Sequence, residues 1–494
     1  MSFHDFLSGA QAGQGLFGSI DGEELQHLIK AMDAGQSDPP TGGTPGAGDP
    51  LRLESLEKTL TRLTFTDEHC PMWRNIPKEA AYSTVEEYNV LNNYGAERLS
   101  AFTSEGELPT ADDATYTRKN VKVKFMGTLR AVSHPLGLVR TAHGDVIAQE
   151  TINGTMWLMR QIEKSLFFGS SSVVSTEYDG FWQQMTDGDT LVTDLANADL
   201  TMDAIEDAAE GIYGVGGFGK LDCLYYGSGV HKRFAQNVFG TANANVRLNA
   251  DNVMGGPAVP GFSLKRVATV FGDVDVKPDV FLQPNAVSAV AASGDSSKRP
   301  SLASAAPTTA LGGAGTVVNS FAVGDYRYTC VGINQYGNSA DKPAGADQAV
   351  GGGDVTKKIE VTLAFNGSIK IGSGGVEMYR SAEGGGTSEM FLIDRFPWGV
   401  NTAKTLGGNA TSGYNAGNQT IVFEDKNAMI AGCGLAFGFT SSQNTFAFKQ
   451  LAPFMKVNLA QIDLRSRWAQ ILYGAPVLRA PKKCVLFKNV KARG

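Results

Sequence analysis

The sequence predicts an α+β chain that is interrupted by an all-β insertion. Helical and strand patterns alternate over residues 51–295, and the longest helical pattern runs from Asp145 to Phe168. Between 301 and 425, by contrast, short strand patterns are separated by turns, 22 of the 125 residues are glycine, and no helical pattern is found. Strand patterns of the earlier kind return after 428. The simplest organisation is therefore one α+β unit that is split by a β module.

Length and composition exclude several classes of protein. The 494 residues exceed one ordinary domain. The 43 Lys and Arg against 50 Asp and Glu give a net charge of −7, which excludes binding to nucleic acid through bulk positive charge. The 42% hydrophobic content excludes global disorder, and no apolar run reaches the roughly 20 residues that span a bilayer. The five cysteines lie far apart, as expected of reduced thiols in a protein made in a cytoplasm: Cys70, Cys223, Cys330, Cys433 and Cys484.

The N-terminal region is expected to be an arm followed by a helix. The stretch DPPTGGTPGAGDP at 38–50 excludes regular structure, because proline lacks a donor and glycine has high backbone entropy. Residues 1–60 hold nine acids and three Lys or Arg. Residues 1–50 are then either a solvated, mobile terminus or an arm that orders against a neighbouring subunit. Leucines three or four residues apart predict a helix within 51–75.

Residues 76–128 are expected to form a long loop with two limbs of opposite charge. SEGELPTADDATY at 104–116 carries four carboxylates, and in the run that begins TRKNVKVKF at 117 apolar residues alternate with lysines. This pattern predicts a partly two-stranded projection. A single hairpin is only marginally stable by itself, so it should be supported by something outside itself.

The rest of the α+β unit is expected in four further segments. Residues 129–184 contain the helix from Asp145 to Phe168, a rod of about 36 Å at 1.5 Å per residue. A mixed α/β unit spans 185–295, and a short return to it spans 429–446. Strands fill 447–494, where ten Lys or Arg from Lys449 onward face one acid, Asp463. An acidic beginning and a basic end could attract one copy of the chain to the next.

No catalytic, cofactor or metal site is predicted. Gly214, Gly216 and Gly219 satisfy G-x-G-x-x-G, but the motif follows a helix and leads into a strand, whereas a dinucleotide loop has the reverse order. The six histidines lack zinc-site spacing, and His143 has no nucleophile setting beside it. The carboxylate pairs at 112–113 and 273/275 are expected to be loop and turn charges, with a structural cation as the alternative.

The segment from about 296 to 428 resembles a known β module. DYRYTCVGINQYGNSA at 325–340, with two tyrosines two apart before a turn, and VEMYRS at 376–381 resemble strands of fibronectin type III or immunoglobulin-like domains. The resemblance implies an immunoglobulin-like β-sandwich at 296–428.

The order of the remaining parts resembles the major capsid protein of tailed bacteriophages, which has the HK-97 type of fold. Three stretches carry local similarity: KLDCLYYGSGVHKRFAQNVF at 220–239, FGDVDVKPDVFL at 271–282 and RWAQILYGAPVLRAPKKCVLFKNV at 467–490. The resemblance implies an N-arm at 1–50, an E-loop at 76–128 and a P-domain with its spine helix at 129–184. It also implies an A-domain at 185–295 with its return at 429–446, and closing P-domain strands at 447–494.

The resemblance further implies the function and the partners. The chain would assemble with itself, as hexamers and pentamers, into the icosahedral head shell that encloses the DNA genome, which it would contact only non-specifically. A portal protein, and a scaffold or decoration protein, would be further partners. Assembly would take place in the host bacterial cytoplasm, without a membrane or a cofactor. The residues expected to meet neighbouring subunits are Asp112, Asp113, Arg118, Lys119, Lys122, Lys124, Arg465, Arg467, Lys482 and Lys483.

Two alternatives remain. One is another virion structural protein, from a tail, a baseplate or a decoration, that carries the same β module, although this gives no reason for a long helix after an arm-like loop. The other is an enzyme such as a glycan hydrolase with an attached fibronectin-like module. A hydrolase of that kind would need paired carboxylates at the mouth of a barrel, and no repeated βα pattern is present.

Overall fold

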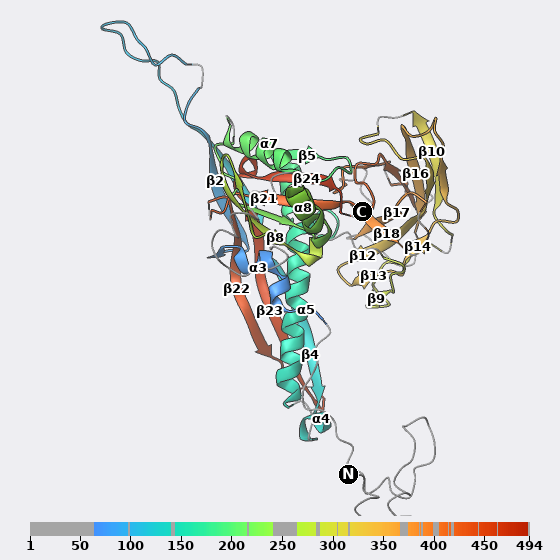
Figure 1. The fold of residues 1–494 in the computed structure, drawn as a ribbon. Coiled ribbons are helices and arrows are strands. Elements are labelled where there is room, and N and C mark those ends of the chain that lie inside the picture. Colours follow the sequence, from blue (N-terminus) through green and yellow to red (C-terminus); the bar gives the residue numbers. More distant parts are fainter. Residues whose placement is uncertain are drawn as a thin grey trace, which may run out of the picture. The chain divides into compact units, whose positions relative to one another are not determined.

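A computed structural model gives the fold of the chain (Figure 1). Residues 64–138 and 146–494 belong to one compact unit. The predicted arm at 1–50 and most of the predicted helix within 51–75 lie outside the described residues. The structure describes residues 64–96, 99–139, 144–214, 217–240, 264–282, 287–303, 305–314, 317–365, 374–384, 386, 389–398, 405–412, 414–415, 419–442, 444–461 and 463–492.

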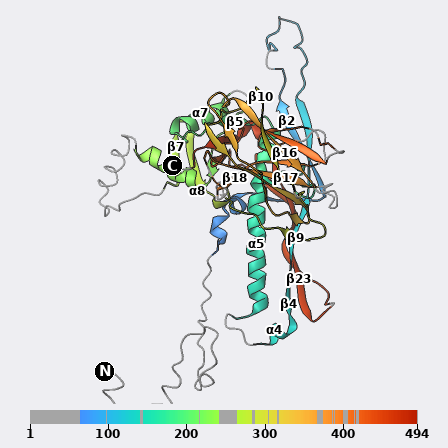
Figure 2. The same cartoon turned by 90° about the vertical axis from the view of Figure 1, so that its right-hand side faces the viewer.

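The first layer of the fold is a four-stranded sheet with a long helix on one face. Its strand order is β1 (Lys78–Ala80), β22 (Phe446–Asn458), β23 (Arg465–Leu478) and β4 (Lys124–Ser133). Helix α5 (Val146–Phe168) lies along β4 and β23 (Figure 2). The Gln470 amide donates to the carbonyl of Thr151 at 2.7 Å, and a Cβ on Gly154 would stand only 2.1 Å from Oε1 of Gln470. Glycine at 154 therefore lets the helix approach β23 closely.

Short elements surround this layer. A 3₁₀ turn and a short helix precede β1, and two further short helices flank α5 in the chain. Their bounds are η2 (Asp67–His69), α3 (Pro71–Asn75), α4 (His134–Leu138) and α6 (Phe181–Asp187). The side chains of Met72, Ile162, Leu166 and Phe181 join one continuous apolar core.

The second layer is a six-stranded sheet with its own apolar cluster. Its order is β5 (Leu191–Asp194), β24 (Val485–Val490), β21 (Gly434–Phe439), β6 (Cys223–Tyr226), β8 (Gly272–Pro278) and β7 (Arg266–Thr269). Residues of α7 (Met202–Tyr213) and α8 (Ser228–Gly240) pack on it. The short elements η3 (Val280–Leu282) and η4 (Pro481–Lys483) adjoin it in the chain. The Phe167 ring of α5 lies 5.1 Å from that of Phe437 in β21, so the long helix joins the two layers.

The place of β24 differs from the sequence prediction. Residues 447–494 were expected to supply strands of the domain that contains the long helix, yet β24 pairs with β21 and β5 of the six-stranded sheet. The reason is its burial, since Val485, Leu486 and Phe487 are all buried and form a continuous apolar run. Such a run is typical of a strand covered on both faces, whereas the last six residues of β22 are all exposed and β23 alternates buried with half-buried residues over much of its length.

The region expected to be an insertion consists, among its described residues, of strands in two facing sheets. One sheet has the order β10 (Thr308–Ala314), β16 (Lys357–Ala364), β20 (Thr420–Asp425) and β19 (Ala410–Thr411). The other has the order β18 (Met390–Pro397), β17 (Gly375–Ser381), β12 (Tyr328–Asn334), β13 (Gly337–Asn338) and β9 (Ser293–Gly294). Three short strands complete the region: β11 (Gly324–Tyr326), β14 (Lys342–Pro343) and β15 (Gln348–Val350). The stacked rings of Phe396 and Phe423, 5.2 Å apart, show that the two sheets enclose a core.

An arginine of the β-sandwich contacts the end of the long helix. Arg395 of β18 donates to the carbonyl of Phe168, the last residue of α5, at 2.5 Å. Its guanidinium also lies 3.4 Å from the carboxylate of Glu177 and 3.2 Å from that of Glu377. A cation at a helix C-terminus satisfies a free carbonyl and complements the helix dipole. Residues of the β-sandwich therefore satisfy the C-terminal end of the long helix.

Candidate assembly surfaces

A hairpin of β2 (Val85–Asn93) and β3 (Thr115–Lys122) occupies the predicted two-limbed loop. Its register runs from Val85 opposite Lys122 to Asn93 opposite Thr115, and it forms a sheet of two strands only. At its base the Glu86 carboxylate accepts hydrogen bonds from the backbone N–H groups of Tyr82 and Ser83, at 2.7 and 2.8 Å. These contacts fix the base of the hairpin, where Val121 packs against the core, whereas most of β3 is exposed.

Large apolar side chains on this hairpin segment face solvent. Phe102 is 92% exposed and Leu108 is 93% exposed, and both lie in the connection between the two strands. Others on the segment are Tyr82, Tyr94 and Tyr116. Several large apolar groups exposed on one segment are typical of an interaction site, because a folded monomer gains nothing from leaving them in water.

The four-stranded sheet has a second apolar surface on the face opposite α5. Phe125 and Leu129 of β4 are more than 60% exposed. They stand opposite Tyr473 and Ala469 of β23, and paired residues of antiparallel strands lie on the same face. Further members of this face are Met455, Val457 and Ile471. The sequence prediction missed this uncovered sheet face, because apolar residues of β4 lie on both faces: Phe125 and Leu129 are exposed, whereas Val132 is buried.

The basic residues predicted in the hairpin segment lie near its base. Lys119, Lys122 and Lys124 line a cavity of about 650 Å³, and Asp179 and Asp187 line it as well. The ammonium of Lys124 donates to the carbonyl of Ser175 at 2.5 Å, and burial lowers the pKa of Lys124. Arg118 instead lies on the exposed part of β3, 3.3 Å from Glu87 of β2. The three lysines and the two carboxylates therefore line the same cavity.

The predicted C-terminal cations lie at two other places. Arg465 and Arg467 both contact Asp463 within the same chain, the first at 3.8 Å. Arg465 pairs with Ser133 at one end of β4, whereas Lys124 begins the other end, about 30 Å away at 3.3 Å per residue. The structure therefore does not bring the two predicted basic groups together.

The remaining predicted interface residues have local contacts. Lys482 lies 3.8 Å from Asp189, and Pro481 before it lines the lysine-bearing cavity. Lys483 belongs to η4 beside it. At the hairpin tip, Asp112 accepts a hydrogen bond from the backbone N–H of Ala96, and Asp113 follows it in the exposed loop. None of these contacts tests a pairing with a neighbouring subunit.

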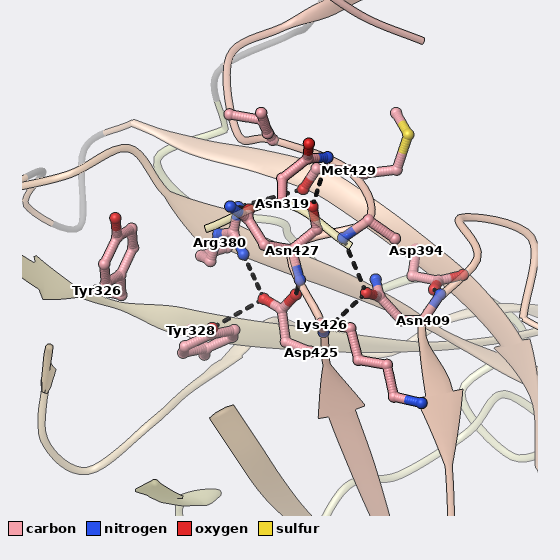
Figure 3. Close-up of polar contacts among 12 residues, drawn as sticks. Asn319, Tyr326, Tyr328, Arg380, Asp394, Asn409, Asp425, Lys426, Asn427 and Met429 are labelled. Carbon is pink, nitrogen blue, oxygen red and sulfur yellow. Dashed lines mark hydrogen bonds and ion pairs between the residues drawn. The ribbon is translucent and has the colours of Figure 1, made fainter. Parts of the chain in front are cut away.

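A buried charge cluster, which the sequence did not reveal, joins the two sheets of the β-sandwich (Figure 3). The guanidinium of Arg380 lies 2.5 Å from the carboxylate of Asp425, which also accepts a 2.8 Å hydrogen bond from the Tyr328 hydroxyl. Arg380 further donates to the Asn427 side chain at 2.7 Å and to the Met429 carbonyl at 3.1 Å. Burial, together with the charge of Asp425, raises the pKa of Tyr328 well above its usual value. The cluster ties β17 and β20 to the segment that leaves the sandwich.

The described residues contain no cluster of three or more His, Cys, Asp or Glu that could hold a metal ion. Among the described helices, none is both long and apolar enough to cross a membrane.

The described residues thus form a two-stranded hairpin, a long helix on a four-stranded sheet and a second, six-stranded layer. The family model described as SU10 major capsid protein matches residues 41–294, which is more than half of the chain. The chain belongs to the SU10 major capsid protein family and is a major capsid protein of a tailed phage.

Individual relatives are similar over most of their length. The major capsid proteins of Staphylococcus phages K and S25-3 are each 27% identical over 456 residues, which cover 89% of this chain and 90% of the relative. Among solved structures, the capsid of Myoviridae phage XM1 aligns over 91% of this chain and 100% of its own, with a TM-score of 0.44 and 8% identity. The structure of Gordonia phage Cozz covers 92% and 98%, with a TM-score of 0.43 and 10% identity.

Proposed function

We propose that this capsid protein closes into an icosahedral head shell through its hairpin, which lies on the uncovered sheet face of a neighbouring copy. The observation that supports this pairing is that both surfaces are apolar and exposed in the single subunit. Full burial of one large apolar side chain contributes about 1.5–3 kcal/mol. Phe102 and Leu108 of one copy, with Phe125 and Leu129 of the next, would then supply most of the affinity.

Charged residues would set the register of the contact. The acidic tip with Asp112 and Asp113 is complementary to the lysines at the hairpin base of another copy. Exposed ion pairs contribute only about 0–1 kcal/mol each, so they select an orientation more than they add affinity. Arg465, Arg467, Lys482 and Lys483 would contact carboxylates of neighbours in the same way.

We extend the proposal to the partners and the setting of assembly. The shell would consist of hexamers and pentamers, assembled in the host bacterial cytoplasm, with a portal protein at one vertex and with a scaffold or decoration protein as a further partner. Contact with packaged DNA would be non-specific, and the subunit would catalyse no reaction. The β-sandwich would be an immunoglobulin-like module, as its two facing antiparallel sheets suggest.

Replacing Phe102 and Leu108 together by serine is expected to prevent closed shells from forming. The change removes about 3–6 kcal/mol of apolar burial per contact, and each contact recurs many times in one particle. Because both side chains are more than 90% exposed, the subunit itself should unfold at an unchanged temperature. Negative-stain microscopy of the full-length protein, expressed with the phage proteins that its assembly needs, is the measurement.

The matched control replaces Val318 and Val323 by serine, since both are exposed apolar residues of the β-sandwich. This control should assemble as the parent chain does. Normal particles from the Phe102 and Leu108 variant would refute the hairpin contact, whereas a parent chain that forms no shell under any condition would refute the shell proposal itself.

A further inference from the structure

The middle of the long helix carries a carboxylic acid that is completely buried. Glu163 of α5 has no exposed surface. Its Oε1 accepts a hydrogen bond from the backbone N–H of Met72 at 2.7 Å, and its Oε2 accepts one from that of Trp73 at 2.8 Å. Both donors belong to the first turn of α3, where backbone N–H groups have no partner within the helix. Glu163 therefore fastens α3 to the long helix.

A second buried carboxyl group belongs to the same cluster. Asp279 follows β8, is also fully buried and immediately precedes η3, which packs against the long helix. Its Oδ1 accepts the backbone N–H of Phe281 at 2.8 Å, and its own N–H donates to the carbonyl of Tyr226 at 2.8 Å. Among the described residues its Oδ2 is buried without a hydrogen-bond partner. Two ionised carboxylates buried this deeply beside each other are strongly disfavoured, so the pair of Glu163 and Asp279 retains one proton.

The groups that face this pair supply no counter-charge. Cys70 lies before α3, Tyr178 lies after the long helix and Tyr225 lies in β6, and all three are buried. The nearby cations stand over rings instead: Lys277 over Tyr225 at 5.6 Å and Lys164 over Phe281 at 6.0 Å. A second negative charge here would be neither solvated nor paired, which is costly in a protein interior.

We propose that Glu163 and Asp279 form a proton-dependent joint, in which one shared proton holds α3, α5 and the end of β8 together. Loss of that proton places two negative charges at one buried position. The contact between α3 and α5 then opens, because α3 is only five residues long and its Glu163 contact is its main polar attachment to the long helix.

The direction of the pH dependence follows from the same groups. Burial, with the charge of Asp279 second, raises the pKa of Glu163 from its usual 4.5 to about 9. Because the pKa of Glu163 is higher in the closed joint than in the unfolded chain, the proton stabilises the closed joint fully at a pH below the unfolded-state pKa. This stabilisation is lost as the pH rises toward the raised pKa of the folded state. With one proton bound only in the closed form, the open population should increase about tenfold per pH unit between about pH 5 and pH 9.

The experiment uses the Cys70 thiol as the probe of opening. Cys70 immediately precedes α3 and is fully buried, so it reacts with iodoacetamide only when the joint opens. The same thiol in the urea-unfolded protein serves as the reference, because its alkylation rate reports the pH dependence of thiol chemistry alone. Peptide-resolved mass spectrometry of the full-length protein gives the alkylation rate of Cys70 under both conditions. The quantity compared is the ratio of the two rates, Cys70 in the folded protein over Cys70 in the unfolded protein.

Between about pH 6 and pH 8 this ratio should rise roughly 100-fold in the parent chain. In Glu163→Gln, where the side chain stays neutral and still accepts one N–H bond, the ratio should change less than about threefold. Asp279→Asn removes the other carboxyl group of the pair, so the ratio should again change little with pH. The test therefore remains valid if one of the two variants fails to fold. A parent ratio that does not rise, or a rise of equal size in both variants, would overturn the joint.

Discussion

Replacing both Lys122 and Lys124 by glutamate is expected to abolish assembly of shells while the subunit stays folded. Lys122 is exposed at the end of β3, and Lys124 begins β4. Both lysines line the cavity of about 650 Å³ that is also lined by Asp179 and Asp187. Reversing the two lysine charges therefore places four carboxylates around this cavity. An acidic hairpin tip of a neighbouring copy would then meet repulsion. Each exposed ion pair contributes only about 0–1 kcal/mol. Like charges that face each other nevertheless suppress association, and the same repulsion recurs at every such contact in the shell.

The measurement combines electron microscopy of particles with thermal unfolding of the soluble subunit. Lys124 loses its hydrogen bond to Ser175 in the variant, a net cost of about 0.5–1.5 kcal/mol, so a small decrease of the unfolding temperature is expected. The matched control reverses Lys298 and Lys357 of the β-sandwich, which gives the same net charge, and it should assemble. Normal particles from the Lys122 and Lys124 variant would remove the hairpin base from the interface.

A charge swap tests the proposed partners directly. Adding Asp112→Lys and Asp113→Lys to the reversed chain restores opposite signs between the hairpin tip and the hairpin base. If these groups meet between neighbours, the quadruple variant should regain particles that the double variant lacks. If it does not, the lysines contribute to assembly through other carboxylates, and the pairing with Asp112 and Asp113 is wrong.

Local patterns in the sequence predicted the local elements well. The helix expected from Asp145 to Phe168 is observed as Val146–Phe168, and in the mixed unit expected at 185–295 a turn with Gly272 at a φ of +130° joins β7 and β8. Helix α7 of the same unit is capped by Thr201, whose hydroxyl accepts the N–H of Ala204 at 3.2 Å. Each of these features depends on residues a few positions apart, which a one-dimensional pattern contains.

The glycine-rich motif was also interpreted correctly from its context. Gly214 follows the last residue of α7 and donates its N–H to the carbonyl of Glu210, and the N–H of Gly219 bonds to the carbonyl of Ile212. These two glycines therefore end a helix and reverse the chain toward β6. The order of helix, loop and strand was sufficient to exclude a phosphate-binding loop, because such a loop opens a helix.

The sequence did not predict which side chains of distant segments contact each other. Arg380 lies in a strand with alternating burial, where a charged residue is ordinarily assigned to the solvent face. Its partner Asp425 is 45 residues away at the end of another strand, and both are buried. Glu163 likewise occupies a helix for which the sequence predicted no site, while its hydrogen bonds come from Met72 and Trp73 of α3, about 90 residues away. A single sequence does not show which buried charges meet.

Replacing Arg380 by leucine is expected to destabilise the β-sandwich more than any exposed substitution in it. The change leaves the fully buried carboxylate of Asp425 without its cation, and breaking a buried ion pair in this way costs about 3–5 kcal/mol. It also removes the donors to Asn427 and Met429, which hold the segment leaving β20. Hydrogen exchange of peptides from β17 and β20, followed by mass spectrometry of the full chain, measures the free energy of opening locally.

The double variant separates the charge from the packing. Arg380→Leu combined with Asp425→Leu removes both charges, so it should be less destabilised than the sum of the two single changes by about 2–3 kcal/mol. Arg327→Leu is the matched control, because Arg327 pairs with a half-exposed Asp347 at 2.8 Å, and its loss should cost less than about 1 kcal/mol. Additive single and double effects would mean that Arg380 acts by filling space, whereas strong coupling would establish that the ion pair joins the two sheets and positions the segment from Asp425 to Met429. Since Arg395 of the same sandwich contacts the end of α5, a sandwich loosened at Arg380 should also increase exchange at the C-terminal turn of that helix.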